Sequence, residues 1–206
     1  MTASEGPQIY LITPPAFELS RFPDQLSRVL DSRPVACLRL ELATRDAEHL
    51  TRAADLCRDV AHARDVAMVI SDHVALAERL GLDGVHLRDG ATAVRAARKS
   101  LGREAIVGRF CGASRHDGMS AGEAGADYIS FGPVTATGLG AGQVAPPELF
   151  EWWSEMIELP VVAEGALDAQ AVARLAAHVD FFGIGEEIWR DEDPAAALRR
   201  LTAALL

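Results

Sequence analysis

The stretch Tyr128-Ile129-Ser130-Phe131-Gly132-Pro133-Val134-Thr135-Ala136-Thr137-Gly138 begins as an apolar run and ends in small residues, hydroxyls and glycines. Such an ending is typical of a β-strand that delivers a loop to the mouth of an active site. A second ending of this kind, Pro160-Val161-Val162-Ala163-Glu164-Gly165, follows far enough along the chain for one helix and one strand to fit between them. This rhythm predicts a parallel α/β repeat, in which functional residues gather at the carboxyl ends of the strands.

The same alternation runs through the whole chain. Short, nearly continuous apolar runs, as expected of strands covered on both faces, are found at Gln8 to Thr13, Val35 to Glu41, Val66 to Ser71, Gly84 to Leu87, Ala105 to Phe110, Tyr128 to Gly132, Pro160 to Gly165 and Phe181 to Gly185. Helix-compatible stretches between and after them are Leu19 to Leu30, Asp46 to Ala63, Val74 to Leu80, Ala91 to Ser100, Gly118 to Ala124, Pro147 to Ile157, Ala169 to His178 and Pro194 to Leu205. Asp46, Asp168 and Asp193 are expected to start helices, because Asp is a favoured N-cap.

These elements predict an α/β fold, a single (β/α)8 TIM barrel that forms one domain over residues 1–206. No low-complexity linker or shift in composition divides the chain. An open doubly wound sheet is the alternative fold, although no Gly-x-Gly-x-x-Gly precedes a helix where a dinucleotide site would want it.

Composition limits the classes of partner. The formal net charge of -10 and the pI near 5.0 disfavour nucleic acid, whose phosphates would be repelled. No apolar run approaches the roughly 18 residues of a membrane span, and the first residues do not resemble a secretory leader. Cys37, Cys57 and Cys111 lack metal-ligand spacing and leave an odd thiol. We therefore expect a soluble cytoplasmic protein that interacts with neither membrane nor nucleic acid.

Several segments, taken in order, resemble the thiamine phosphate synthase and thiazole tautomerase superfamily of small (β/α)8 barrels. The segments that carry the resemblance are Tyr10 to Thr13, Ser71-Asp72-His73-Val74-Ala75-Leu76-Ala77, Leu82-Asp83-Gly84-Val85-His86-Leu87, Gly125 to Pro133 and Pro160 to Gly165. In the synthases a pyrimidine pyrophosphate loses pyrophosphate, and the nitrogen of a thiazole phosphate captures the carbocation while magnesium assists the leaving group. The resemblance thus implies a transferase of thiamine biosynthesis whose ligands are a phosphorylated pyrimidine and a phosphorylated thiazole.

The resemblance also implies roles for individual residues. It assigns phosphate or substrate binding to Arg39, Thr135, Thr137 and the pair Gly165-Ala166. It assigns Mg²⁺ as cofactor, with Asp72 as a ligand and Asp89 as a substitute for a second carboxylate that the family places two residues later.

Other positions depart from the family pattern. Glu41 replaces a lysine that helps to grip pyrophosphate, Gly138-Leu139 stands where another phosphate-binding lysine is expected, and Glu186 replaces a serine beside the thiazole phosphate. A carboxylate about 4 Å from a phosphate repels it by about 1 to 4 kcal/mol, depending on the effective dielectric. A non-catalytic binding or regulatory barrel that has lost the pyrophosphate site is therefore an alternative function.

A third function follows from Ser114-Arg115-His116, which resembles the Ser-x-His of the same superfamily. In the thiazole tautomerases a histidine of that loop shuttles a proton, so His116 and Ser114 are candidate catalytic residues. The plainer alternative is that His116 is a solvent-facing loop residue, because general acid-base catalysis makes strict geometric demands that few loop histidines meet.

Plainer structural roles remain open for other candidates. Asp72 is a possible helix N-cap, and Arg39 a possible partner of Glu41 or Asp72. His86, inside an apolar run, is expected to be a buried, hydrogen-bonded barrel residue rather than a metal ligand. Glu164, Glu186 and Glu187 are either solvated rim charges or the lining of a cation pocket. Trp152-Trp153 suggests packing, or the interface of a possible homodimer.

Overall fold

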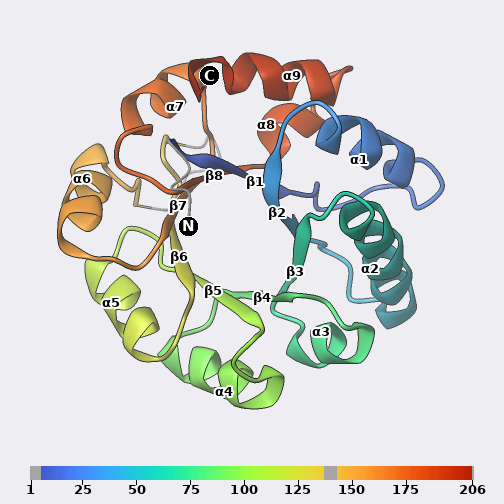
Figure 1. Cartoon of the computed structure of the whole chain (residues 1–206), viewed down its shortest axis with the longest axis horizontal. Helices are drawn as coiled ribbons and strands as arrows, with labels where there is room; N and C mark the ends of the chain where they lie inside the picture. The colour runs from blue at the N-terminus through green and yellow to red at the C-terminus, as the bar shows by residue number, and fades with distance from the viewer. Residues whose placement is uncertain (1–5, 137–142, 206) are drawn as a thin grey trace.

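The fold is a closed barrel of eight parallel strands in chain order, surrounded by helices (Figure 1). The computed structural model describes residues 6–136 and 143–205. The predicted (β/α)8 barrel is confirmed, and the open-sheet alternative is wrong because β1 pairs with β8 as well as with β2. The strands are β1 Gln8–Ile12, β2 Val35–Leu40, β3 Ala67–Ser71, β4 Gly84–Leu87, β5 Ile106–Phe110, β6 Tyr128–Phe131, β7 Val161–Glu164 and β8 Phe181–Ile184.

The helices form the outer ring of Figure 1. They are α1 Phe22–Leu30, α2 Ala47–His62, α3 Val74–Leu80, α4 Ala91–Leu101, α5 Arg115–Glu123, α6 Pro147–Met156, α7 Ala169–Leu175, α8 Glu186–Trp189 and α9 Pro194–Leu201, followed by a 3-10 turn at Ala203–Leu205. The short helix α8 was not predicted. None of the helices in this described part of the chain is long and apolar enough to cross a membrane.

Side-chain caps explain where several helices begin. Asp46, Asp168 and Asp193 each accept a hydrogen bond from a backbone N–H in the first turn of α2, α7 and α9, as predicted. Ser114 caps α5 by accepting from the N–H of Asp117 at 3.2 Å. This cap starts α5 at Arg115, three residues before the predicted start.

The buried apolar residues of the described ranges form two separate clusters. The larger cluster lies between the strands and the outer helices, and the smaller one lies inside the barrel. The members of the smaller, inner cluster are Tyr10, Ile12, Cys37, Val69, Tyr128 and Val162. Burial raises the pKa of Cys37 to about 12, and all three cysteines are buried and unpaired.

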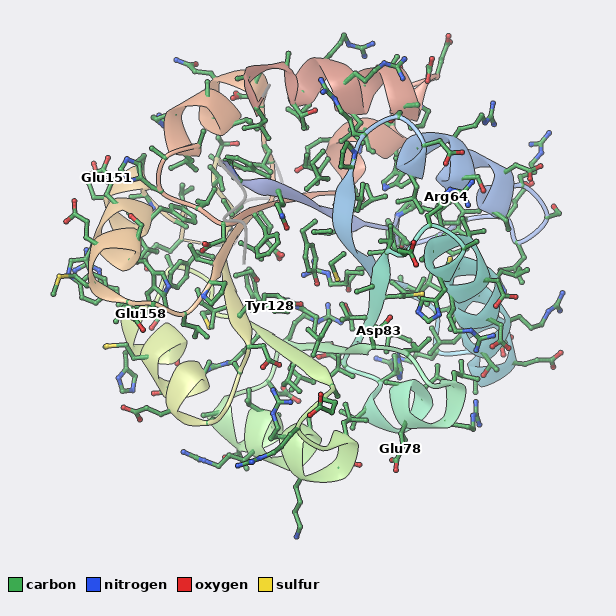
Figure 2. The ribbon with its side chains drawn as sticks, viewed as in Figure 1. Arg64, Glu78, Asp83, Tyr128, Glu151 and Glu158 are labelled. Atoms are coloured by element: carbon green, nitrogen blue, oxygen red, sulfur yellow. The ribbon has the colours of Figure 1, made fainter. Side chains whose placement is uncertain are left out.

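Gly108 makes room for Tyr128, one of the two tyrosines of the inner cluster. It pairs with Tyr128 across β5 and β6, and Figure 2 shows Tyr128 inside the ring of strands. A Cβ on Gly108 would lie 2.0 Å from Cζ of that ring. The glycine is therefore required by the volume of the tyrosine.

We predict that Gly108→Ala destabilises the protein by about 1 to 3 kcal/mol through overpacking, measured as the free energy of unfolding in urea. Gly90→Ala is the control, because a Cβ there meets nothing within 4 Å. Equal stability of Gly108→Ala and Gly90→Ala would contradict this account of the barrel interior.

Candidate active site at the carboxyl ends of the strands

A buried ion pair spans the barrel mouth. Arg39 of β2 reaches Glu164 of β7, with Nη1 at 2.8 Å from Oε2 and Nη2 at 3.4 Å from Oε1. The exposed fractions of these side chains are only 7% and 11%. Burial disfavours the charged guanidinium, but Glu164 and then Tyr10 and Glu41 outweigh it and hold the pKa of Arg39 above its ordinary value.

The ion pair continues along the rim of the mouth. Nε of Arg39 lies 3.3 Å from Oε2 of Glu41, whose Oε1 lies 3.4 Å from Nη1 of Arg88. Nε of Arg88 donates to Oδ2 of Asp72 at 2.7 Å, and the Arg88 backbone N–H donates to Oδ1 at 2.9 Å. We call Glu164, Arg39, Glu41, Arg88 and Asp72 the charge ladder. Its signs alternate, and its formal charge is -1.

The ladder shows which structural partners Arg39 and Asp72 have, while phosphate binding by Arg39 and metal binding by Asp72 stay predictions. Arg39 pairs with Glu41, as one alternative proposed, and with Glu164, which sequence reasoning missed. The interpretation of Asp72 as an N-cap is wrong, because the N-cap of α3 is His73 and Asp72 holds φ at +60°. Asp72 instead uses its carboxylate to bind the loop that follows β4.

A chain of hydrogen bonds lies below the ladder inside the barrel. His86 Nδ1 is 3.0 Å from the hydroxyl of Tyr128, which is 2.6 Å from the hydroxyl of Tyr10. Burial, with Arg39 and Arg88 adding to it, holds the pKa of His86 well below its usual value, so the ring is neutral. Nε2 of His86 and Oγ of Ser130 are buried without a hydrogen-bond partner in the described part of the chain. His86 is thus the buried, hydrogen-bonded barrel residue that the sequence indicated.

The loops after β6 and β7 bring three predicted phosphate-binding residues together. The hydroxyl of Thr135 donates to the carbonyl of Ala166 at 2.7 Å, and the N–H of Val134 donates to the carbonyl of Gly165 at 2.9 Å. Gly165 and Ala166 both have positive φ, of 84° and 56°. The loops are therefore fixed to each other, while Thr137 lies outside the described residues.

The carboxylate of Glu187 accepts hydrogen bonds from backbone N–H groups in the segments that follow β7 and β8. Its Oε1 accepts from the N–H of Leu167 at 3.1 Å, and its Oε2 accepts from the N–H of Gly185 at 2.8 Å. Its neighbour Glu186 pairs instead with Arg190 on the surface. Glu164, Glu186 and Glu187 thus have different partners: Arg39, Arg190 and backbone N–H groups. The hypothesis that these three glutamates line one cation pocket is wrong.

Three other predicted site residues are not part of the ladder. Ser114 caps α5, and His116 is exposed in the first turn of that helix. Asp89 is exposed after β4. The side chains of His116 and Asp89 make no hydrogen bond or ion pair with the residues that the structure describes, so their predicted chemical roles stay predictions.

The tryptophan pair does not form an exposed patch. Trp153 is fully buried, and its Nε1 donates to the carbonyl of Leu159 at 2.8 Å. Trp152 is half-buried, and the guanidinium of Arg115 lies 4.4 Å from the centroid of its ring. Packing accounts for both residues, and a homodimer stays a prediction.

The carboxylates of the mouth are already committed to other groups. Both oxygens of Asp72 accept hydrogen bonds from Arg88, and Oε2 of Glu41 accepts from Ser71 Oγ at 2.6 Å. Among residues 6–136 and 143–205, no three His, Cys, Asp or Glu side chains are grouped so as to hold a metal ion. In this arrangement the donor set does not fit the implied Mg²⁺, which needs free carboxylate oxygens.

Comparisons with known proteins agree with this architecture. A family model described as thiamine monophosphate synthase matches residues 9–187. A thiamine-phosphate synthase of Rhodospirillum centenum is 42% identical over 194 residues, which cover 93% of this chain and 94% of that protein. A thiamine-phosphate synthase of Erythrobacter litoralis is 37% identical and covers 95% of each chain.

The solved structures include a thiamine phosphate pyrophosphorylase from Pyrococcus furiosus. It superposes with a TM-score of 0.83 at 20% sequence identity, covering 96% of this chain and 95% of its own. At that identity the likeness shows the fold alone.

We predict that Glu164→Gln lowers the free energy of unfolding by about 3 kcal/mol, because it leaves the buried charge of Arg39 without its main counterion. The matched control is Glu186→Gln, which removes the same charge from a side chain that is 51% exposed and should change stability by less than about 0.5 kcal/mol. Urea unfolding measures both variants. Similar small effects for the two would show that the buried pair does not stabilise the mouth.

Proposed function

This chain belongs to the thiamine monophosphate synthase family, and we propose that it joins a hydroxymethylpyrimidine pyrophosphate to a thiazole phosphate and releases pyrophosphate. The observation that carries this proposal is the 42% identity to a thiamine-phosphate synthase over 93% of the chain. In the reaction the bond from the pyrimidine methylene carbon to the pyrophosphate oxygen breaks, and a bond from that carbon to the thiazole nitrogen forms. The pyrophosphate keeps the electron pair of the broken bond.

The charge ladder suits the cation that forms when this bond breaks. Its three carboxylates and two guanidiniums leave one net negative charge at the mouth, in a region partly shielded from water. Fixed charges that need no reorganisation stabilise a developing charge better than water does. The ladder would therefore favour the pyrimidine carbocation while the neutral His86 adds no opposing charge.

The loops after β6, β7 and β8 supply the proposed site for the thiazole phosphate. Thr135 and Ala166 are held together there, and backbone N–H groups are suitable donors to phosphate. The carboxylate of Glu187 now accepts from Leu167 and Gly185, so a phosphate that uses these donors must displace it. Proximity of the two bound substrates would then account for much of the rate acceleration.

Magnesium is the cofactor that membership of the family implies, and no step of the proposed reaction is assigned to it. Bound magnesium would neutralise charge on the leaving pyrophosphate. Because Arg88 holds both oxygens of Asp72, we assign no residue of this arrangement to the metal.

A second candidate function is a binding or regulatory barrel without catalysis. It is favoured by the pairing of Arg39 with two carboxylates and by the position of Glu187 on the backbone amides. Such a barrel would take a less anionic thiazole or pyrimidine. Proton transfer at His116 has no comparable support, since this side chain is exposed on α5.

We further propose a cytoplasmic location, supported by three cysteines that are all unpaired. The polar and charged mouth suits phosphorylated small molecules as ligands.

The deciding experiment incubates the purified protein with hydroxymethylpyrimidine pyrophosphate and thiazole phosphate. The product, thiamine phosphate, is then oxidised to a fluorescent compound and quantified. Formation of thiamine phosphate in proportion to enzyme concentration supports the synthase. Binding of either ligand without product would favour the non-catalytic barrel.

We predict that Glu187→Ala binds thiazole phosphate on the order of tenfold more tightly, because two backbone N–H groups lose a competing carboxylate. Isothermal titration calorimetry measures the affinity. Glu186→Ala is the control. It removes an equal charge at the neighbouring position, from a side chain that pairs with Arg190 and not with the backbone N–H groups. An equal gain in both variants would indicate a general charge effect, and no gain in Glu187→Ala would place the phosphate elsewhere.

A further inference from the structure

Arg88 lies where two carboxylates of the mouth converge. Its Nε is 2.7 Å from Oδ2 of Asp72, and its Nη1 is 3.4 Å from Oε1 of Glu41. A hydrogen bond from Ser71 to the other oxygen of Glu41 fixes that carboxylate in place. Two carboxylates from neighbouring strand ends are an arrangement that attracts a hard divalent cation, and here a guanidinium lies between them.

The backbone reinforces this position. Asp72 has a left-handed conformation with φ of +60°, which is uncommon for a residue other than glycine. Its Oδ1 accepts from the backbone N–H of Arg88, so the loop after β3 is bound to the loop after β4. The carboxylate is thus aimed at Arg88 by both its backbone and its hydrogen bonds.

The outer end of Arg88 remains open. Its side chain is 59% exposed; Nη1 is paired with Glu41 at 3.4 Å, and Nη2 donates no hydrogen bond within the part of the chain that the structure describes. Arg39 differs, since it is 7% exposed and directs both terminal nitrogens to Glu164. Of these two guanidiniums in the ladder, Arg88 is the one with donors left for an anionic ligand.

We propose that Arg88 is a built-in cation that takes the place of a divalent metal between Asp72 and Glu41 and binds the phosphate oxygens of the ligand directly. The ligand class, a phosphorylated small molecule, rests on the proposed function. Two consequences follow. The free protein binds divalent metal poorly at the mouth, and it binds pyrophosphate without metal.

The first test titrates Mn²⁺, as a probe for hard divalent cations, into the wild type and Arg88→Ala and follows free Mn²⁺ by electron paramagnetic resonance. We expect Arg88→Ala to bind Mn²⁺ on the order of tenfold or more tightly, because the variant removes a positive charge next to two carboxylates. Arg95→Ala is the matched control, an exposed arginine of α4, and should behave as the wild type. Equal titrations of the wild type and Arg88→Ala, whether tight or absent, overturn the proposal.

The second test measures binding of inorganic pyrophosphate by calorimetry in the presence of EDTA. The wild type and Arg95→Ala should bind, and Arg88→Ala should bind on the order of tenfold more weakly. Arg88→Lys keeps a cation and should continue to exclude Mn²⁺, which separates loss of charge from misfolding. Pyrophosphate binding that requires added metal, or that survives Arg88→Ala unchanged, overturns the proposal.

These readouts separate this inference from the proposed function. Absence of turnover, together with metal-free pyrophosphate binding through Arg88, would contradict the synthase and leave the inference standing. Turnover together with tight Mn²⁺ binding by the wild type would support the synthase and contradict the inference about Arg88.

Discussion

The buried guanidinium of Arg39 is the constraint on which the mouth of this barrel depends. A charge that is 93% shielded from water needs a counterion, and Glu164 supplies it from the opposite side of the barrel. Glu41, the second partner of Arg39, adds a further negative charge that Arg88 offsets from the end of β4. Arg88 in turn holds Asp72, so one buried charge fixes the side chains at four strand ends.

This arrangement determines what a phosphorylated ligand meets at the mouth. Carboxylates engage the inner cation, Arg39, through all three of its nitrogens, whereas the outer cation, Arg88, pairs with Glu41 through Nη1 and donates no hydrogen bond from Nη2 to a described residue. On the opposite side, the backbone N–H groups of Leu167 and Gly185, which we propose as donors to phosphate, donate to the carboxylate of Glu187. We therefore expect anion binding to depend on Arg88 and on displacement of the Glu187 carboxylate, which distinguishes this mouth from one lined with unpaired lysines and arginines.

Much of the fold could be predicted from the sequence, because strands covered on both faces are continuous apolar runs and because Asp at positions 46, 168 and 193 caps helices locally. The ladder could not be predicted. Arg39 and Glu164 lie 125 residues apart and meet only after the barrel closes. The predicted loop residues Thr135, Gly165 and Ala166 were brought together, since they follow neighbouring strands.

Residues without a local signal were missed. In the sequence, nothing distinguishes Arg88 from an ordinary exposed arginine after a strand. Its role follows from its contacts with Asp72 and Glu41, which only the folded barrel brings close to it. The backbone contacts of Glu187 could not be predicted, because the helix α8 that positions this side chain is only four residues long and was not predicted. A double-mutant cycle with Arg39→Met and Glu164→Leu, followed by urea unfolding, tests the central claim most directly. The account predicts that the double variant is more stable than the sum of the single losses implies, by about 2 kcal/mol or more, because neither charge is left alone. Additive losses within about 0.5 kcal/mol would contradict it.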